Sequence, residues 1–388
     1  MKSVLWRYYA FNAFWNILFV APVIVPFFTQ WGHINLFQVQ LLQSWYSLWC
    51  LLFEVPTGIL ADKIGRKYTM SAGAFITALA CLAYGSVPNF IVFLAAEFIF
   101  ALGISLISGA DQALLYELLQ ENGRENESVR YFGRSNSFQL VGIIIGSLLG
   151  SLIANYFGLR IPFLLSAIPV AVAGFIALSL REPKSHKKLE KESVFTNFKN
   201  GYAYLLQHKT LRLLAFDSII VYTVAYFVLW LWQPFLQKIG IAILYFGLFQ
   251  TVFTVGEIFV SNHFTNLEKI VGSAKNYFRF SALATALSFI LVALFPNLVT
   301  ILLFVLLAGS VGLSRKIAMS AYMNKFISSD KRATVLSSVS TFESLFVTIA
   351  NPIIGLLALH SIQLAALLLG IIPLAVFFFS PLEQKMLD

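Results

Sequence analysis

Six carboxylates lie inside long apolar stretches of this 388-residue sequence, at Glu54, Glu97, Asp111, Asp217, Glu257 and Glu343. An ionised side chain in apolar surroundings costs several kcal/mol, so it faces a cavity, pairs with a cation or marks an ion pathway. A carboxylate in that setting can also take up and release a proton. These residues are therefore candidates for carrying protons, and Glu97, Glu257 and Glu343 lie deepest in their stretches by residue count.

Two of these acids share one face of a predicted helix. Glu97 and Asp111 are fourteen residues apart, which at about 100° per residue places them within about 40° of each other. A helix through this stretch would carry an acidic stripe. Arg315 and Lys316 stand in a later apolar stretch. An alternative is that Asp111 and these two cations lie close enough to the end of a helix to reach water.

The composition predicts which elements position these side chains. Hydrophobic residues make up 59% of the chain and charged residues 12%, with 38 phenylalanines, which is incompatible with an ordinary soluble domain. A bilayer core of about 30 Å takes roughly 20 apolar residues per helix. The sequence therefore predicts an all-α polytopic membrane protein with twelve spans, near residues 8–28, 37–61, 68–86, 89–117, 133–156, 161–180, 211–233, 244–262, 277–295, 298–320, 333–358 and 362–380.

The basic residues predict the orientation of these spans. Of the 27 Lys and Arg, only Arg160 and Lys238 fall in loops on one side, and short loops rich in Lys and Arg stay in the cytoplasm. Both termini are therefore expected to be cytoplasmic. The net charge of +9 follows from this topology and from attraction to anionic lipid. Because the cations are scattered among helix ends, the expected partner is the lipid bilayer and not nucleic acid. Short loops favour a bacterial cytoplasmic membrane.

The sequence lacks the usual motifs of enzymes. The sequence contains no His-Glu-x-x-His, no Gly-x-Ser-x-Gly and no phosphate-binding loop, which are signatures of metalloproteases, hydrolases and nucleotide-driven machines. The five histidines fall in or beside loops without forming a ligand pair, and both cysteines fall in predicted spans. We therefore expect no enzyme activity, cofactor or metal. A membrane-embedded enzyme or sensor is the most distant alternative.

A charged loop joins the second and third predicted spans. It reads Gly58-Ile-Leu-Ala-Asp62-Lys-Ile-Gly65-Arg66-Lys67. Gly58 lets helices approach closely, Gly65 permits a turn closed to other residues, and Asp62 can pair with Arg66 across that turn. The string resembles, position for position, the signature loop after the second helix of the major facilitator superfamily.

The resemblance implies two pseudo-symmetric six-helix bundles that work by alternating access. The bundles would be residues 1–182 and 211–388, joined by a cytoplasmic linker at 183–210 in which Val194 to Leu206 suggest an amphipathic helix. Weak repeats offset by about 205 residues agree with a duplicated unit. By the same resemblance, the loop would contact the ends of spans four and eleven, which places Glu117 and Arg332 with Arg66 in one charge cluster.

The resemblance also assigns a central cavity to spans one, four, seven and ten. Glu97, Asp111, Asp217, Arg315 and Lys316 would then line it. Because Arg315 and Lys316 are the repeat counterparts of the Asp111 position, we expect Asp111 to pair with one of them. Among polar residues in the spans, we select Asn12, Asn16 and Tyr226 as contacts for substrate, whereas several tryptophans fit an interfacial aromatic belt.

A glycine pattern occupies the fifth predicted span. Gly133, Gly142, Gly146 and Gly150 have spacings of nine, four and four, and they resemble the antiporter signature of the same superfamily, although Ser147 replaces its proline. Small residues at every fourth position also pack membrane helices of any function. Span four lacks the arginine common in drug antiporters of the superfamily, and Glu97 is its deepest charge.

These features together predict a secondary transporter that moves a small molecule. The favoured hypothesis is proton-coupled efflux of a lipophilic or cationic compound, as in multidrug antiporters, by a protein working as a monomer. The alternative is an uptake transporter or uniporter for a nutrient or metabolite on the same scaffold.

Overall fold

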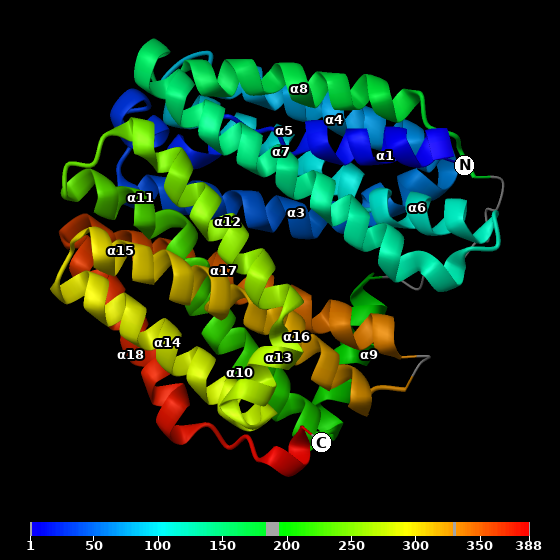
Figure 1. Ribbon diagram of the computed structural model, residues 1–388. Helices are drawn as coiled ribbons and strands as arrows, with labels where there is room; N and C mark the ends of the chain where they lie inside the picture. Colours follow the sequence, from blue (N-terminus) through cyan, green and yellow to red (C-terminus); the bar gives the residue numbers. More distant parts are fainter. Residues whose placement is uncertain (1, 184–193, 329–330, 388) are drawn as a thin grey trace. The chain divides into compact units, whose positions relative to one another are not determined.

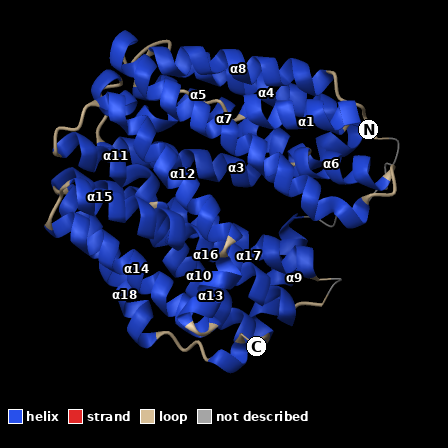
Figure 2. Ribbon diagram, viewed as in Figure 1, coloured by secondary structure: helices blue, strands red, loops and turns tan. Residues whose placement is uncertain are grey.

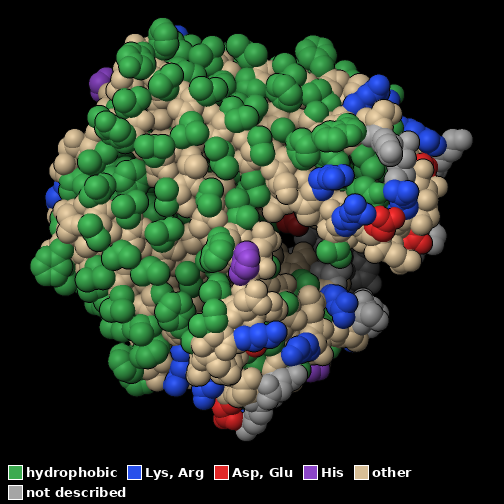
Figure 3. Space-filling view, in the orientation of Figure 1, with side chains coloured by type: hydrophobic (Ala, Val, Ile, Leu, Met, Phe, Trp, Pro, Cys, Tyr) green, Lys and Arg blue, Asp and Glu red, His purple; other side chains and the backbone are tan. Residues whose placement is uncertain are grey.

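The computed structural model describes residues 2–183, 194–328 and 331–387, and these residues form helices joined by short loops, with no strand among them (Figures 1 and 2). Nine helical segments in this part of the chain are long and apolar enough to cross a membrane. Hydrophobic side chains cover much of the face visible in Figure 3, as a surface in contact with lipid requires. The prediction of an all-α polytopic membrane protein is confirmed.

The described residues divide into two compact units. Unit 1 contains the described residues up to 183 together with Ala242–Thr251, and unit 2 contains residues 194–241 and those from Val252 onward. The predicted division into six plus six spans stays a prediction. The linker cations Lys184, Lys187, Lys188 and Lys191 lie outside the described residues.

Unit 1 is built on seven helices of eight residues or more, several of which run side by side in Figure 1. Their buried faces form one apolar core that includes Tyr8, Phe11 and Leu115. The first span continues beyond α1 through three short helical segments, a 3-10 helix at Ala21–Val23, an α-helical turn at Ile24–Pro26 and a π-helix at Phe27–Trp31. The seven helices are α1 (Lys2–Trp15), α3 (Leu36–Ile64), α4 (Arg66–Tyr84), α5 (Phe90–Ser108), α6 (Asp111–Gln120), α7 (Ser128–Phe157) and α8 (Ile161–Leu178).

Unit 2 has its own apolar core, which includes Leu214, Tyr277 and Met319. A helix, α9, occupies Val194–Gln207, the stretch in which the sequence suggested an amphipathic helix. The other helices are α10 (Lys209–Tyr226), α11 (Val228–Lys238), α12 (Phe246–Asn262, whose first residues belong to unit 1), α13 (Phe264–Val271), α14 (Ala274–Leu294), α15 (Leu298–Phe304), α16 (Leu313–Met323), α17 (Arg332–His360) and α18 (Ile362–Phe379), with a π-helical segment at Val305–Gly312.

Each of the twelve predicted spans contains helix, but four of them are interrupted. The fourth breaks between α5 and α6, the seventh between α10 and α11, and the tenth changes to a π-helix between α15 and α16. The first span loses its helix after Trp15. The interrupted spans are thus the four to which the family resemblance assigns the central cavity. Discontinuous helices are where transporters commonly place binding sites.

Glycines of α7 lie against the end of α1 and the unwound stretch that follows it. An added side-chain carbon at Gly142 would collide with the carbonyl of Ala13, and one at Gly150 with the carbonyl of Phe19. The backbone N–H of Phe19 donates to the Ser166 hydroxyl at 2.9 Å. Irregular backbone at membrane depth is tolerated when protein groups satisfy it in this way. Gly146 also faces this stretch, whereas Gly133 has open space around it.

Candidate functional site

The charged loop forms a compact cluster of ion pairs in unit 1. Arg66 donates two hydrogen bonds to Glu117, from Nε at 2.9 Å and from Nη2 at 2.5 Å, and its Nη2 lies 3.6 Å from Asp62. The turn at Gly65 has φ of +108°, a conformation that residues with side chains rarely adopt. The predicted contact between the loop and the end of the fourth span is therefore present.

Glu182 completes this cluster from the end of the sixth span. Its two carboxylate oxygens accept hydrogen bonds from the backbone N–H groups of Arg66 at 2.6 Å and Lys67 at 2.9 Å. A carboxylate at this position satisfies the first free N–H groups of α4 and opposes the positive end of its dipole. The sequence assigned Glu182 no role, although it closes the string Ser179-Leu-Arg-Glu182, which has a counterpart near the end of the chain.

Unit 2 contains an equivalent arrangement with different chemistry. The Gln384 side chain accepts a hydrogen bond from the backbone N–H of Lys275 at 3.1 Å, at the start of α14. Tyr322 donates to Glu268 at 2.7 Å where unit 1 has its Arg66–Glu117 pair. Arg332 is exposed at the start of α17, and its predicted membership of the charge cluster stays a prediction.

Glu97 is buried in unit 1 beside a neutral amide. Its side chain is part of a residue only 4% exposed, and the Gln43 amide nitrogen from α3 donates to it at 3.2 Å. No ion pair joins Glu97 to a cation in the part of the chain that the structure describes. Gln43 was not predicted as a partner because nothing in the sequence links positions so far apart.

Asp111 begins α6, directly after the interruption in the fourth span. The Tyr8 hydroxyl donates to its backbone carbonyl at 3.5 Å. The Oδ1 atom of Asp111 is buried and makes no hydrogen bond with any described residue. Unit 1 therefore holds two carboxylates for which the described residues provide no cation.

The predicted pairing of Asp111 with Arg315 or Lys316 would join the two units and stays a prediction, and both cations have partners inside unit 2. Arg315 is 1% exposed and pairs with Asp217, which is 5% exposed, while Lys316 Nζ lies 2.5 Å from Glu343. Both cations thus have carboxylate partners within unit 2. Consecutive residues on a helix point about 100° apart, so the two cations face different neighbours.

The buried Asp217–Arg315 pair is embedded in further hydrogen bonds. Arg315 also donates to the carbonyl of Phe278 and to the hydroxyl of Ser281, and the Ser380 hydroxyl donates to Asp217 Oδ2 at 2.8 Å. Such hydrogen bonds offset part of the cost of burying an ion pair, although Arg315 Nε is buried without a hydrogen bond to any described residue. This network ties α10, α14 and α16 to the end of α18.

The other predicted residues occupy varied surroundings. Glu54 is exposed and Glu257 is half-buried. The side-chain nitrogens of Asn12 and Asn16 donate to the carbonyls of Tyr8 and Asn12, at 3.2 and 2.8 Å, so both amides bond to their own helix near its break. Tyr226 is half-buried at the end of α10.

Comparison with known proteins identifies the family. The model for the Major Facilitator Superfamily matches residues 9–261. The chain belongs to this superfamily. Its curated relatives include the chloramphenicol resistance protein CraA of Acinetobacter baumannii, 25% identical over 38% of this chain and 35% of CraA. Another is the putative niacin/nicotinamide transporter NiaP of Bacillus subtilis, 27% identical over 46% of this chain and 43% of NiaP.

Solved structures of other proteins have the same fold as this chain. The chain matches a crystal structure of a mutant of the nucleoside transporter NupG with a TM-score of 0.86 and 15% identity, over 99% of this chain and 100% of that one. Identity at this level indicates the fold alone. The chain spans about half the length of the curated relatives it matches.

Proposed function

We propose that this protein is a secondary transporter that exports a small lipophilic or cationic compound in exchange for protons, by alternating access. The observation that carries the proposal is the difference in charge between the two units. Arg315 and Lys316 of unit 2 pair with Asp217 and Glu343, whereas Glu97 and Asp111 of unit 1 have no ion pair with any described cation. Something outside the described side chains must neutralise these two acids in an apolar medium.

A proton or a cationic substrate can supply that neutralisation. If both use the same carboxylate, each excludes the other, and exchange across the membrane follows from the competition. CraA is named for chloramphenicol resistance, which agrees with export. The Arg66, Asp62, Glu117 and Glu182 cluster would stabilise one conformation of the transport cycle, because it joins the loop to the ends of two other spans.

Uptake or facilitated diffusion of a nutrient is the second candidate. NiaP carries the name of a niacin or nicotinamide transporter, and the fold matches that of NupG over nearly the whole chain. In this case Glu97, held by Gln43, would be a structural polar pair in the wall of the transport path.

The deciding experiment is proton flux in liposomes that contain the purified protein and a pH-sensitive dye. A panel of lipophilic cations and metabolites is added in turn, and under the proposal one of them changes the internal pH. The change should disappear in Glu97→Gln or Asp111→Asn and persist in Glu125→Gln, which removes an exposed carboxylate of unit 1. If radiolabelled substrate equilibrates without any pH change, the protein is a uniporter and the coupling proposal fails.

A further inference from the structure

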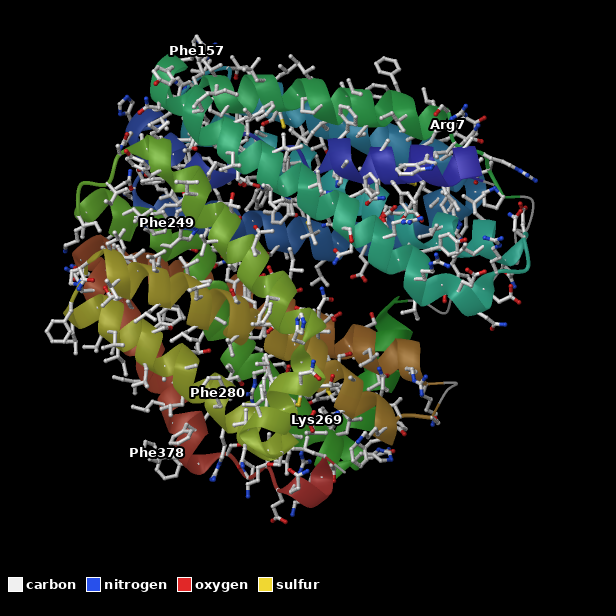
Figure 4. The ribbon with its side chains drawn as sticks, viewed as in Figure 1. Arg7, Phe157, Phe249, Lys269, Phe280 and Phe378 are labelled. Carbon is white, nitrogen blue, oxygen red and sulfur yellow. The ribbon has the colours of Figure 1, made fainter. Side chains whose placement is uncertain are left out.

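A basic pocket lies in unit 1, away from the buried carboxylates. Its volume is about 360 Å³, and its polar lining consists of Arg124, Arg130, Arg134, Tyr9 and Tyr131. The residues come from the start of α1, the turn before α7 and the first turns of α7. Figure 4 places Arg7 at the end of unit 1 opposite Phe157, the last residue of α7. The pocket thus lies at the end that the distribution of Lys and Arg predicts to be cytoplasmic.

The positive charge of this pocket exceeds its negative charge. Glu127 lies 3.7 Å from Arg124 and 3.6 Å from Arg130, so one carboxylate serves two guanidinium groups at long distances. Arg124 also donates to the Tyr131 hydroxyl at 2.6 Å, which fixes its position. With Arg134 as the third cation, the arrangement leaves at least two positive charges for a ligand.

Tyr9 provides a buried donor for the same ligand. Its residue is 2% exposed, yet its hydroxyl makes no hydrogen bond with the described residues. The ring is held in place, stacked on Phe138 with centroids 5.3 Å apart and met edge-on by Trp6 at 6.1 Å. An unpaired buried hydroxyl is unfavourable, and a ligand oxygen that accepts its hydrogen bond would remove that cost.

We propose that this pocket binds a phosphate group, and that the group belongs to an anionic phospholipid of the cytoplasmic leaflet. Guanidinium forks and tyrosine hydroxyls together suit the several oxygens of a phosphate. Trp6 in the pocket lining is 57% exposed, and Val129, which precedes Arg130 in the sequence, is 84% exposed, so the cationic site has exposed apolar side chains at and next to it. Basic pockets at this depth of a membrane protein recognise lipid headgroups. This site is separate from the proposed transport path.

Binding is measured on the full-length protein in detergent by its thermal stabilisation and by native mass spectrometry. The probes are dioleoyl phosphatidylglycerol, dioleoyl phosphatidylcholine and inorganic phosphate. We expect phosphatidylglycerol to bind at least tenfold more tightly than phosphatidylcholine, with affinity falling as salt rises. The double variant Arg130→Gln with Arg134→Gln should lose this preference. Arg212→Gln, which removes an exposed arginine of unit 2, should keep it.

Tyr9→Phe separates ligand binding from folding. It keeps the stacked ring and removes only the unpaired hydroxyl, so the lipid-free protein should be as stable as the wild type or more stable. Its affinity for phosphatidylglycerol should nevertheless fall about threefold. Tight binding of inorganic phosphate without lipid preference would show a soluble phosphate ligand and overturn the lipid assignment. Equal phosphatidylglycerol binding by wild type, Tyr9→Phe and the double variant would overturn the site itself.

Discussion

The buried Asp217–Arg315 pair gives the sharpest prediction about stability. Exposed ion pairs contribute about 0–1 kcal/mol, whereas removing one partner of a buried pair costs about 3–5 kcal/mol. With exposed fractions of 1% and 5%, this pair belongs to the second class. Arg315 keeps two other acceptors, at Phe278 and Ser281. We therefore expect Asp217→Leu to cost about 3 kcal/mol, roughly a hundredfold in the unfolding equilibrium.

A double-mutant cycle tests this reasoning. Arg315→Met alone should cost a similar amount because it leaves Asp217 charged and buried, with Ser380 as a neutral partner. The double variant Asp217→Leu with Arg315→Met replaces the pair by apolar groups and should be far more stable than the sum of the single changes. The coupling energy should be about 3 kcal/mol. Unfolding by SDS in mixed micelles, followed by circular dichroism, measures each step.

The matched control is an ion pair near the surface of unit 1. Arg181 and Glu121 lie 3.5 Å apart with 56% and 15% of their side chains exposed. The same cycle there should give a coupling energy below about 1 kcal/mol. A coupling energy near zero for Asp217 and Arg315 would falsify the view that their pairing maintains unit 2.

Three further predictions concern unit 1. Arg66→Glu or Glu117→Arg alone should reduce transport at least tenfold, and the two changes together should restore part of it. Substrate flux in liposomes measures both effects. Unchanged flux in the single variants would contradict a role for the pair. Glu182→Ala exposes unpaired N–H groups at the start of α4 and should cost about 1–2 kcal/mol in SDS unfolding, and a cost near zero would show that the cap is dispensable. Gly142→Ala forces a side chain onto a backbone carbonyl and should lower the free energy of unfolding by about 1–3 kcal/mol. Gly133→Ala, in open space, should be neutral or slightly stabilising. Equal effects of the two changes in SDS unfolding would refute the packing argument.

The apolar runs of the sequence predicted the spans. A helix in lipid needs a continuous apolar stretch, and such a stretch is visible in the sequence without knowledge of the structure. The breaks inside four spans were not predictable. The first span, for example, loses its helix where Phe19 bonds to Ser166, a contact between positions far apart in the chain. The hydrophobicity of the residues does not indicate where the backbone leaves the helical conformation.

A contact in the site was predictable where both of its residues lie in one sequence motif. Asp62 and Arg66 are four residues apart on consecutive turns, so the motif itself suggested their contact. Glu182 reaches that motif from more than a hundred residues away, and only the repeated string at its position hinted at a role. The pairing of Arg315 with Asp217 depends on helix rotation, which adjacency in sequence leaves open.

The predicted repeat would account for the unequal distribution of charges between the two units. At the repeat offset of about 205 residues, Asn12 corresponds to Asp217 and Asp111 corresponds to Lys316. Unit 2 thus carries an acid on α10 and cations on α16, and each cation meets a carboxylate inside the unit. Unit 1 carries an amide on α1 and an acid on α6, so its carboxylate lacks the cation that the repeat supplies in unit 2.

Under the proposed proton coupling, this exchange of residue types would separate the groups that stabilise the fold from the groups that respond to protons. A pair such as Asp217 and Arg315 keeps its charges because removing either one is costly. Asp111, with a buried oxygen that bonds to no described residue, has no such partner to keep it ionised. Under the proposed proton coupling, Glu97 and Asp111 are therefore acids at which uptake of a proton would change the local charge most. This is why the coupling experiment targets Glu97 and Asp111, and why Asp217 is tested by stability.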